Sequence, residues 1–172
     1  GSDAAALQCK ATPHGDGYVI TGSKAWITHG GRADFYSLFA RTGEGSRGIS
    51  CFLVPADQPG LSFGKPEEKM GLAAVPTTSA FYDNAAIDAE RRSGAEGQGL
   101  QIAFSALDSG RLGIAAVAVG IAQAALDEAC AYANDRTTFG RKIIDHQGLG
   151  FLLADMAAAV ASSKTAANAS HF

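Results

Sequence analysis

The feature that most constrains the fold is an apolar stripe in the second half of the chain. Apolar side chains recur there at steps of three and four, extended over one skipped position. They are Phe104, Leu107, Ile114, Ala118, Ile121, Ala125, Ala129 and Tyr132. This spacing predicts one helix of about 35 residues from Leu100 onward, well beyond the common helix length.

A second helix is predicted after the glycine-bearing loop RTTFGRKII. Asp145 stands at the expected N-cap, ahead of the segment HQGLGFLLADMAAAVASSKTAANA. Two alanine-rich helices joined by a short loop cannot bury their apolar faces on each other alone. We therefore expect the hairpin to belong to a four-helix bundle whose remaining helices this chain does not supply.

The first half of the chain has the pattern of β-structure. Runs rich in β-branched and aromatic residues, GYVITG, DFYSLFAR, GISCFLVP and TSAFYDNAAI, are separated by the turn clusters HGDG, TGEGSRG and ADQPG. They predict a small antiparallel β-sandwich or barrel. Because the composition changes at SGAEGQG, we expect an α+β protein with a β domain over residues 1–93 and a helical domain over residues 94–172.

Composition excludes several functions. The net charge at pH 7 is −3 and the basic residues are scattered, so nucleic-acid binding is not expected. The longest apolar run, residues 112–125, is too short to cross a bilayer, so no membrane span is expected. The three cysteines are far apart, which gives neither a disulfide framework nor metal-ligand spacing and favours a reducing compartment.

Two short segments combine an aromatic residue with hydrogen-bonding groups. In KAWIT, Trp26 is either a core residue of a strand or a stacking face for an aromatic cofactor, with Thr28 supplying a hydroxyl. In RTTFG, Phe139 either plugs the core at an interhelical turn or accompanies a phosphate site where Arg136 offers a forked donor. The residue types alone leave both alternatives open.

Arg111 is the skipped position, the one charge in the apolar stripe, and Asp108 lies one turn before it. The pair is either a surface ion pair or, on a buried stripe, a site whose guanidinium needs a ligand. His146 opens the second helix beside Gln147, where a ligand contact and a cap are both reasonable. The glycines of GAEGQG have the wrong order for a dinucleotide fingerprint, so we interpret that segment as a loop and helix entry.

An ordered set of motifs closely resembles the acyl-CoA dehydrogenase family. The motifs are GSDAAAL, GSKAWITHGG, RGISCFLVP, GLSFGKPEEKMGL, LDSGRLGIAAVAVGIAQAALDEACAYANDRTTFGRKIIDHQ and LADMA. They correspond to the family's middle β domain and the first half of its C-terminal four-helix domain. The resemblance implies an FAD-dependent oxidoreductase of fatty acid metabolism that converts acyl-CoA to trans-2-enoyl-CoA. A glutamate takes the α proton, the β hydride passes to flavin N5, and the electrons leave to an electron-transferring flavoprotein.

The resemblance also assigns roles to individual residues. Trp26 would pack on the flavin ring, Ile27 would offer backbone contacts, and Thr28 would give its hydroxyl to N5. The residues implied to meet the acyl-CoA substrate are Ser2, Asp108 and Arg111. The implied FAD contacts after the long helix are Arg136, Thr138, Phe139, His146 and Gln147. Arg136 is expected to reach the pyrophosphate held by a neighbouring subunit, which implies a homo-oligomer, specifically a tetramer.

No catalytic residue is expected within this chain. In some branches of the family the catalytic glutamate immediately precedes the helix arginine, but Gly110 occupies that position here, and His29 stands where asparagine is frequent. An acyl-CoA oxidase, a nitroalkane-oxidase-like flavoenzyme and a non-catalytic flavin-binding relative are the alternatives. No targeting segment is visible, so the expected location is the cytoplasm of a bacterium or the mitochondrial matrix of a eukaryote.

Overall fold

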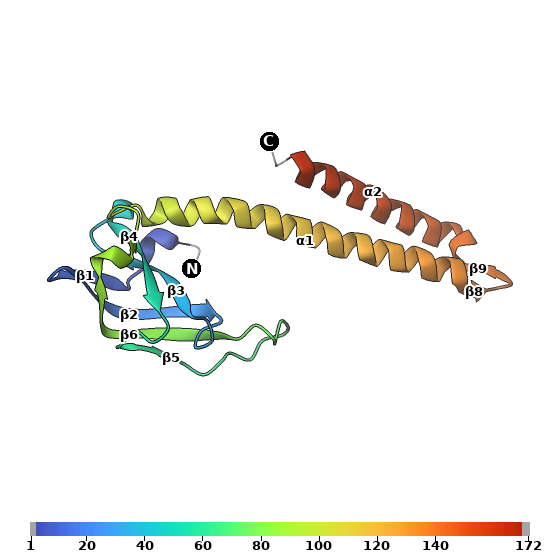
Figure 1. Ribbon diagram of the computed structural model, residues 1–172. Coiled ribbons are helices and arrows are strands. Elements are labelled where there is room, and N and C mark those ends of the chain that lie inside the picture. Colours follow the sequence, from blue (N-terminus) through green and yellow to red (C-terminus); the bar gives the residue numbers. More distant parts are fainter. Residues whose placement is uncertain (1–2, 170–172) are drawn as a thin grey trace. The chain divides into compact units, whose positions relative to one another are not determined.

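The computed structural model describes residues 3–169 and has the α+β architecture predicted from the sequence (Figure 1). A seven-stranded sheet precedes two long helices. The chain forms two compact units, one up to Phe104 and one from Ser105 onward. Helix α1 (Gly99–Asp135) begins in the first unit and continues into the second, so the boundary between the units falls within this helix.

The sheet unit carries most of the short elements. Its strands are β1 (Lys10–His14), β2 (Gly17–Thr28), β3 (Phe35–Arg41), β4 (Ile49–Pro55), β5 (Leu61–Phe63), β6 (Thr77–Asp88) and β7 (Arg92–Ser93). Its 3-10 turns are η1 (Ala4–Ala6), η2 (Ser46–Gly48) and η3 (Ala89–Arg91). The second unit adds the hairpin β8 (Thr137–Thr138) and β9 (Arg141–Lys142), the turn η4 (Ile143–Asp145), and helix α2 (Gln147–Ala169).

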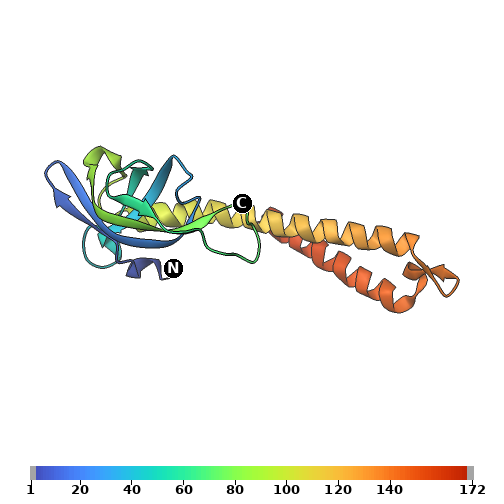
Figure 2. The ribbon, with the colours of Figure 1, turned by 90° about the horizontal axis from the view of Figure 1, so that it is seen from below.

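The sheet has the order β5-β6-β2-β1-β3-β4-β7 and curls around one core. All its pairs are antiparallel except β1 and β3, which run parallel through the single pair Lys10 and Arg41, so the sheet is mixed rather than wholly antiparallel. The ring centroids of Tyr18 on β2 and Phe52 on β4 are 5.0 Å apart, although two strands separate β2 from β4 in the sheet. The sheet therefore folds back on itself, and its curvature is visible in Figure 2.

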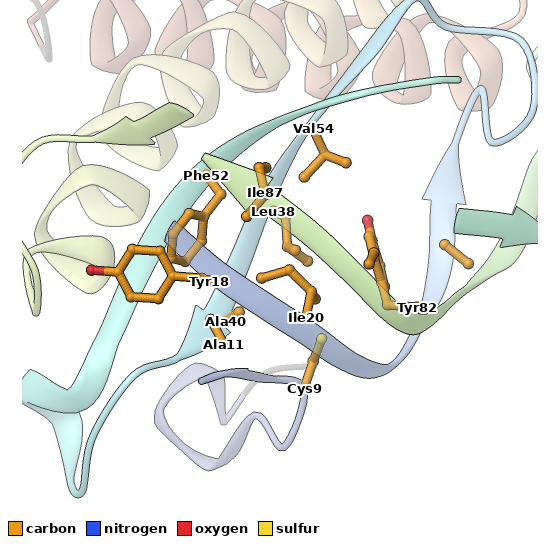
Figure 3. Close-up of a cluster of buried hydrophobic side chains, with 12 residues drawn as sticks. Cys9, Ala11, Tyr18, Ile20, Leu38, Ala40, Phe52, Val54, Tyr82 and Ile87 are labelled. Atoms are coloured by element: carbon orange, nitrogen blue, oxygen red, sulfur yellow. The ribbon is translucent and has the colours of Figure 1, made fainter. Parts of the chain in front are cut away.

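The core is built mainly from one face of the sheet. On β3, on β6 and in the first part of β2 the buried residues alternate with more exposed ones, as the two-residue repeat of a strand requires (Figure 3). Strand β4 differs, because its first four residues, from Ile49 to Phe52, are all buried. The cluster consists of Cys9, Ala11, Tyr18, Ile20, Leu38, Ala40, Phe52, Val54, Ala80, Tyr82, Ala85 and Ile87. Strands β2, β3, β4 and β6 match the four β runs predicted from the sequence. The short strands β1, β5 and β7 had no clear pattern in the sequence.

The long pairing of β2 with β6 is interrupted by a bulge on β6. Ile20 pairs with Ala85, but Gly22 pairs with Tyr82, so β6 contains one extra residue between these pairs. Asn84 lies there in the left-handed region, with φ of 50°. Asparagine tolerates this conformation better than most residues, which explains its place in the bulge. Without a second irregularity, the remainder of β2 would be displaced by one residue against β6.

Helix α1 is apolar on two faces. Helix α2 runs antiparallel to α1 (Figures 1 and 2), and Gln123 of α1 is hydrogen-bonded to Lys164 of α2. Leu126 and Ala133, three and ten residues after Gln123, lie on the same side by helical spacing and are buried. The stripe predicted from the sequence lies on another side, where Ile114, Ile121 and Tyr132 are exposed. One partner helix therefore covers only one of the two faces, which agrees with a helix that belongs in a larger bundle.

Helix α2 begins later than the sequence suggested. Its first residue is Gln147, and the backbone carbonyl of His146 accepts the hydrogen bond from the Gly150 amide at 3.1 Å. His146 therefore occupies the N-cap, and the prediction of Asp145 as the cap was wrong by one residue. Asp145 instead ends the 3-10 turn η4.

Helix α1 is also long and apolar enough to cross a membrane, judged by length and composition alone, and among residues 3–169 it is the one helix that passes this test. The core helix of a soluble protein passes the same test, so the result alone is weak evidence. Here the Lys164 Nζ of α2 donates a hydrogen bond of 2.6 Å to Gln123 Oε1 of α1. This polar contact in the middle of the apolar stretch favours a bundle helix, because such groups are costly to place against lipid.

The left-handed position of Asn84 makes a testable prediction. Replacing Asn84 with valine should lower the free energy of unfolding by about 1–2 kcal/mol, because a β-branched residue is strained at positive φ. Asn84→Gly should change it by less than about 0.5 kcal/mol, since glycine adopts this conformation freely. Urea unfolding of both variants measures the difference.

The matched control is Asp88→Val, which places the same side chain on an exposed residue of the same strand that has a negative φ. We expect its effect to stay within about 0.5 kcal/mol, as for most surface substitutions. Equal effects of valine at both positions would contradict the bulge as described.

Candidate functional site

A second bulge, on β2, determines where the solitary tryptophan lies. Lys24 pairs with Ala80 and Ile27 pairs with Thr78, so β2 has one extra residue between these pairs. Strict alternation would point Trp26 to the same face as the buried residues of β2. Because of the extra residue, Ile27 points to the buried face instead and packs against the core, whereas Trp26 is 71% exposed. Of the two interpretations left open by the sequence, the core role of Trp26 is therefore excluded.

Trp26 adopts a backbone conformation that large side chains avoid. Its φ is 61°, in the left-handed region. For a residue other than glycine this costs about 1–2 kcal/mol, and such strain persists only where the surroundings fix it. Here the β2–β6 ladder resumes at Ile27, and the Gly30 amide donates to the Ile27 carbonyl at 3.2 Å. A strained, exposed aromatic residue held on a rigid strand is a typical element of a binding site.

Thr28 is exposed beside a hollow of about 270 Å³ in the sheet unit. Lys24, Thr28, Tyr36 and Tyr82 are among the residues that line the hollow. Burial lowers the pKa of Lys24, an effect that the nearby Cys9 thiol opposes, and burial raises the pKa of Tyr82 to about 12. These directions indicate a poorly solvated space in which the Tyr82 phenol stays neutral at ordinary pH.

The turn after β2 is supported by Tyr36, a residue that the sequence did not single out. The Tyr36 hydroxyl donates to the His29 carbonyl at 3.1 Å and accepts from the Gly31 amide at 2.8 Å. The His29 amide donates to the Pro76 carbonyl at 2.8 Å, and His29 itself has a φ of 54°. Tyr36 alternates with Leu38 and Ala40 on the buried face of β3. This alternation was the one feature of the sequence that could have indicated an inward-pointing Tyr36.

A second group of candidate residues surrounds the hairpin between the helices. Thr137 pairs with Lys142 and Thr138 pairs with Arg141, so the segment interpreted as a loop is a two-residue β-hairpin. Its turn residues Phe139 and Gly140 both have positive φ, 51° and 75°, as tight hairpin turns require.

Phe139 is 97% exposed, so of its two alternatives the core plug is excluded among the residues that the structure describes. Arg136, which follows α1 directly, is also exposed, and its guanidinium makes no hydrogen bond or ion pair with the residues that the structure describes. Its five N–H donors remain available for a ligand. Gln147, the first residue of α2, is exposed as well.

His146 connects the hairpin to the start of α2. Its Nε2 lies 3.2 Å from Thr138 Oγ1, and its Nδ1 lies 3.0 Å from the Arg141 guanidinium. The Phe139 ring approaches the imidazole edge-on, with centroids 6.0 Å apart and planes at 82°. Thr138, Phe139 and His146 therefore form one cluster, and Arg141 joins it without having been identified from the sequence.

Asp108 and Arg111 form an ion pair of 3.3 Å on the exposed side of α1. Their side chains are 74% and 72% exposed, so the pair contributes little to stability by itself. Arg111 keeps most of its donors free for a ligand. Ser2 lies outside the described residues. Within residues 3–169, no group of three or more His, Cys, Asp and Glu side chains is placed to hold a metal ion.

Two sequence models of one family match the chain: "Acyl-CoA dehydrogenase, middle domain" over residues 1–85 and "Acyl-CoA dehydrogenase, C-terminal domain" over residues 97–170. The short-chain specific acyl-CoA dehydrogenase of Clostridium acetobutylicum is 44% identical over 166 residues, which are 95% of this chain and 44% of that protein.

Solved structures are similar over almost the whole chain. Butyryl-CoA dehydrogenase from Megasphaera elsdenii has a TM-score of 0.92 at 39% identity, covering 98% of this chain and 45% of the other. The prolyl acyl carrier protein oxidase AnaB has a TM-score of 0.94 at 31% identity, covering 99% of this chain and 46% of the other. The chain thus spans a little under half the length of these relatives.

The position of Trp26 can be tested through stability. Trp26→Gly should change the free energy of unfolding by less than about 1 kcal/mol, because relief of the left-handed strain offsets the entropy of the added glycine. A buried tryptophan would lose about 3–5 kcal/mol on truncation. Thermal or urea unfolding distinguishes these two cases.

The adjacent residue provides the control. Ile27→Ala should cost about 2 kcal/mol, because Ile27 packs against the core while Trp26 does not. A larger loss for Trp26→Gly than for Ile27→Ala would show that Trp26 is the inward residue.

Proposed function

The chain belongs to the acyl-CoA dehydrogenase family, and we propose that the full protein oxidises an acyl-CoA thioester to the trans-2-enoyl-CoA, using FAD. The observation that carries this proposal is the bulge on β2, which holds an exposed aromatic face, Trp26, two residues from an exposed hydroxyl, Thr28. That combination suits a flat, hydrogen-bonding ring system. Bound FAD would supply the hydride acceptor that the protein side chains lack.

The residues around Trp26 fit this cofactor in different ways. The indole offers one flat face, and the Thr28 hydroxyl can donate to a ring nitrogen or accept a proton from it. The side chain of Ile27 packs on the core and its carbonyl already accepts from Gly30, so its contribution would come from the backbone N–H. The exposed faces of Trp26 and Thr28 need no rearrangement before binding, which lowers the cost of association.

We propose that the hairpin residues contact the diphosphate side of FAD held by a neighbouring subunit. The free guanidinium of Arg136 and the hydroxyl of Thr138 are suitable donors for phosphate oxygens. Phe139, His146 and Gln147 would complete this surface. The proposal requires a homo-oligomer, and the family resemblance favours a tetramer.

Asp108 and Arg111 are proposed to meet the CoA portion of the substrate, together with Ser2. The glutamate that takes the α proton is proposed to lie outside this chain, because position 110 is glycine. The proposed electron acceptor is an electron-transferring flavoprotein. Direct reaction with oxygen is the second candidate, since the oxidase AnaB is as similar in fold as the dehydrogenase from Megasphaera elsdenii.

The full-length protein provides the test. Purified protein should carry a yellow flavin, and anaerobic titration with saturated acyl-CoAs of graded length should bleach its absorbance for at least one chain length. A protein without flavin, or a flavin that no thioester bleaches, would overturn the proposal. Fast reoxidation of the bleached protein by air would identify an oxidase, whereas reoxidation only by an electron-transferring flavoprotein would identify a dehydrogenase.

Thr28→Val removes the hydroxyl and keeps the side-chain volume. We expect flavin reduction by the best acyl-CoA to slow by roughly 10- to 1,000-fold, because a hydrogen bond that strengthens as charge develops is lost. Stopped-flow absorbance measures the rate. Thr21→Val, an exposed threonine elsewhere on β2, is the control and should leave the rate unchanged. An unchanged rate in Thr28→Val would show that this hydroxyl does not serve the flavin.

A further inference from the structure

Arg141 lies on β9 and reaches across the hairpin to the residue that caps α2. Its Nη2 is 3.0 Å from His146 Nδ1. On the other side of the imidazole, Nε2 is 3.2 Å from Thr138 Oγ1. The three side chains therefore form a continuous hydrogen-bonded chain from a cation to a hydroxyl.

The direction of each hydrogen bond in this chain follows from its first member. A guanidinium can only donate, so His146 Nδ1 must accept and cannot carry a proton. The proton of the imidazole therefore resides on Nε2 and is donated to Thr138 Oγ1. Without Arg141, either ring nitrogen could carry the proton, and the role of Thr138 would be undetermined.

The consequence concerns the hydroxyl proton of Thr138. Because its oxygen already accepts from His146, that proton must be given to another acceptor. Among the residues that the structure describes, none accepts it. The hydroxyl is thus a donor available to a ligand, on a hairpin that also carries the exposed cations Arg136, Arg141 and Lys142.

We propose that Arg141 is a positioning residue that fixes the His146 tautomer and thereby makes Thr138 a donor to phosphate oxygens of the bound cofactor. This inference deepens the proposed function and rests on it. A diphosphate presents only acceptors, which matches the free donors of Arg136 and Thr138 on this surface. In this arrangement Arg141 contributes more than its charge. It also sets the direction of two hydrogen bonds in which it takes no part, from His146 to Thr138 and from Thr138 to the ligand.

The tautomer can be observed without any ligand. In the flavin-free full-length protein labelled with ¹⁵N-histidine, ring-nitrogen correlation spectra should show a protonated Nε2 and an unprotonated Nδ1 for His146. In Arg141→Met the proton should redistribute between both nitrogens, whereas Lys142→Met, which removes the same charge from the same strand, should leave the spectrum unchanged. A proton on Nδ1 in the parent, or identical spectra for the parent and Arg141→Met, would overturn the inference.

Binding of FAD to the same flavin-free proteins measures the consequence. Arg141→Met should weaken FAD binding about 10- to 100-fold, the loss of a hydrogen bond to a charged group, and Lys142→Met should weaken it less. Adding Thr138→Val to Arg141→Met should cause little further loss, because Arg141 acts through Thr138. Arg141→Lys keeps a donor and should retain more affinity than Arg141→Met.

Additive losses for Arg141→Met and Thr138→Val, or equal losses for Arg141→Met and Lys142→Met, would show that Arg141 acts by charge alone and overturn the inference. Failure of the parent protein to bind FAD would instead overturn the proposed function. The spectra recorded without FAD test the His146 tautomer independently, so they distinguish failure of the inference from failure of the proposed function.

Discussion

One extra residue in β2 determines what this part of the molecule can bind. The strand has a strict two-residue repeat, and that repeat would place Trp26 inside the sheet with Tyr18 and Ile20. The bulge after Lys24 passes the inward position to Ile27 and turns the indole outward. An opposite bulge at Asn84 on β6 precedes it, so the ends of the two strands pair in the same register, Gly17 with Asp88 and Thr28 with Thr77. The exposed aromatic face is therefore obtained without disturbing the rest of the sheet.

The hairpin between the helices also holds an exposed aromatic residue at positive φ. Phe139, like Trp26, is an exposed aromatic residue at positive φ, followed closely by residues that hydrogen-bond within the same segment. Neither side chain is buried in the unit that carries it, and each requires an unfavourable backbone conformation. Strain of this kind, kept in two separate places and each time beside a free hydroxyl or guanidinium, supports a binding role for both segments.

The sequence predicted the main elements from different signals, and all of them are present. The long helix follows from apolar spacing of three and four residues, and the second helix follows from its cap signal. The four main strands follow from runs of β-branched and aromatic residues between turn clusters. The sequence could not decide the direction of Trp26, because a bulge shifts the repeat by one residue without leaving a characteristic motif. It also left open whether Phe139 plugs a core, since hairpins with a left-handed phenylalanine are unusual. Arg141 was missed because its role depends on a contact with His146 that spacing alone does not reveal.

The central claim is that the bulge on β2 presents Trp26 as a face for the flavin. Trp26 is the only tryptophan of the 172 residues, so the fluorescence of this chain reports on that residue alone. The most direct measurement is a titration of the flavin-free full-length protein with FAD, followed by tryptophan emission, with any tryptophan outside these 172 residues replaced by phenylalanine. The account predicts the emission of a water-exposed indole at the start and saturable quenching as FAD binds. Emission of a buried indole, or an exposed indole whose emission FAD does not quench in a saturable way, would contradict it.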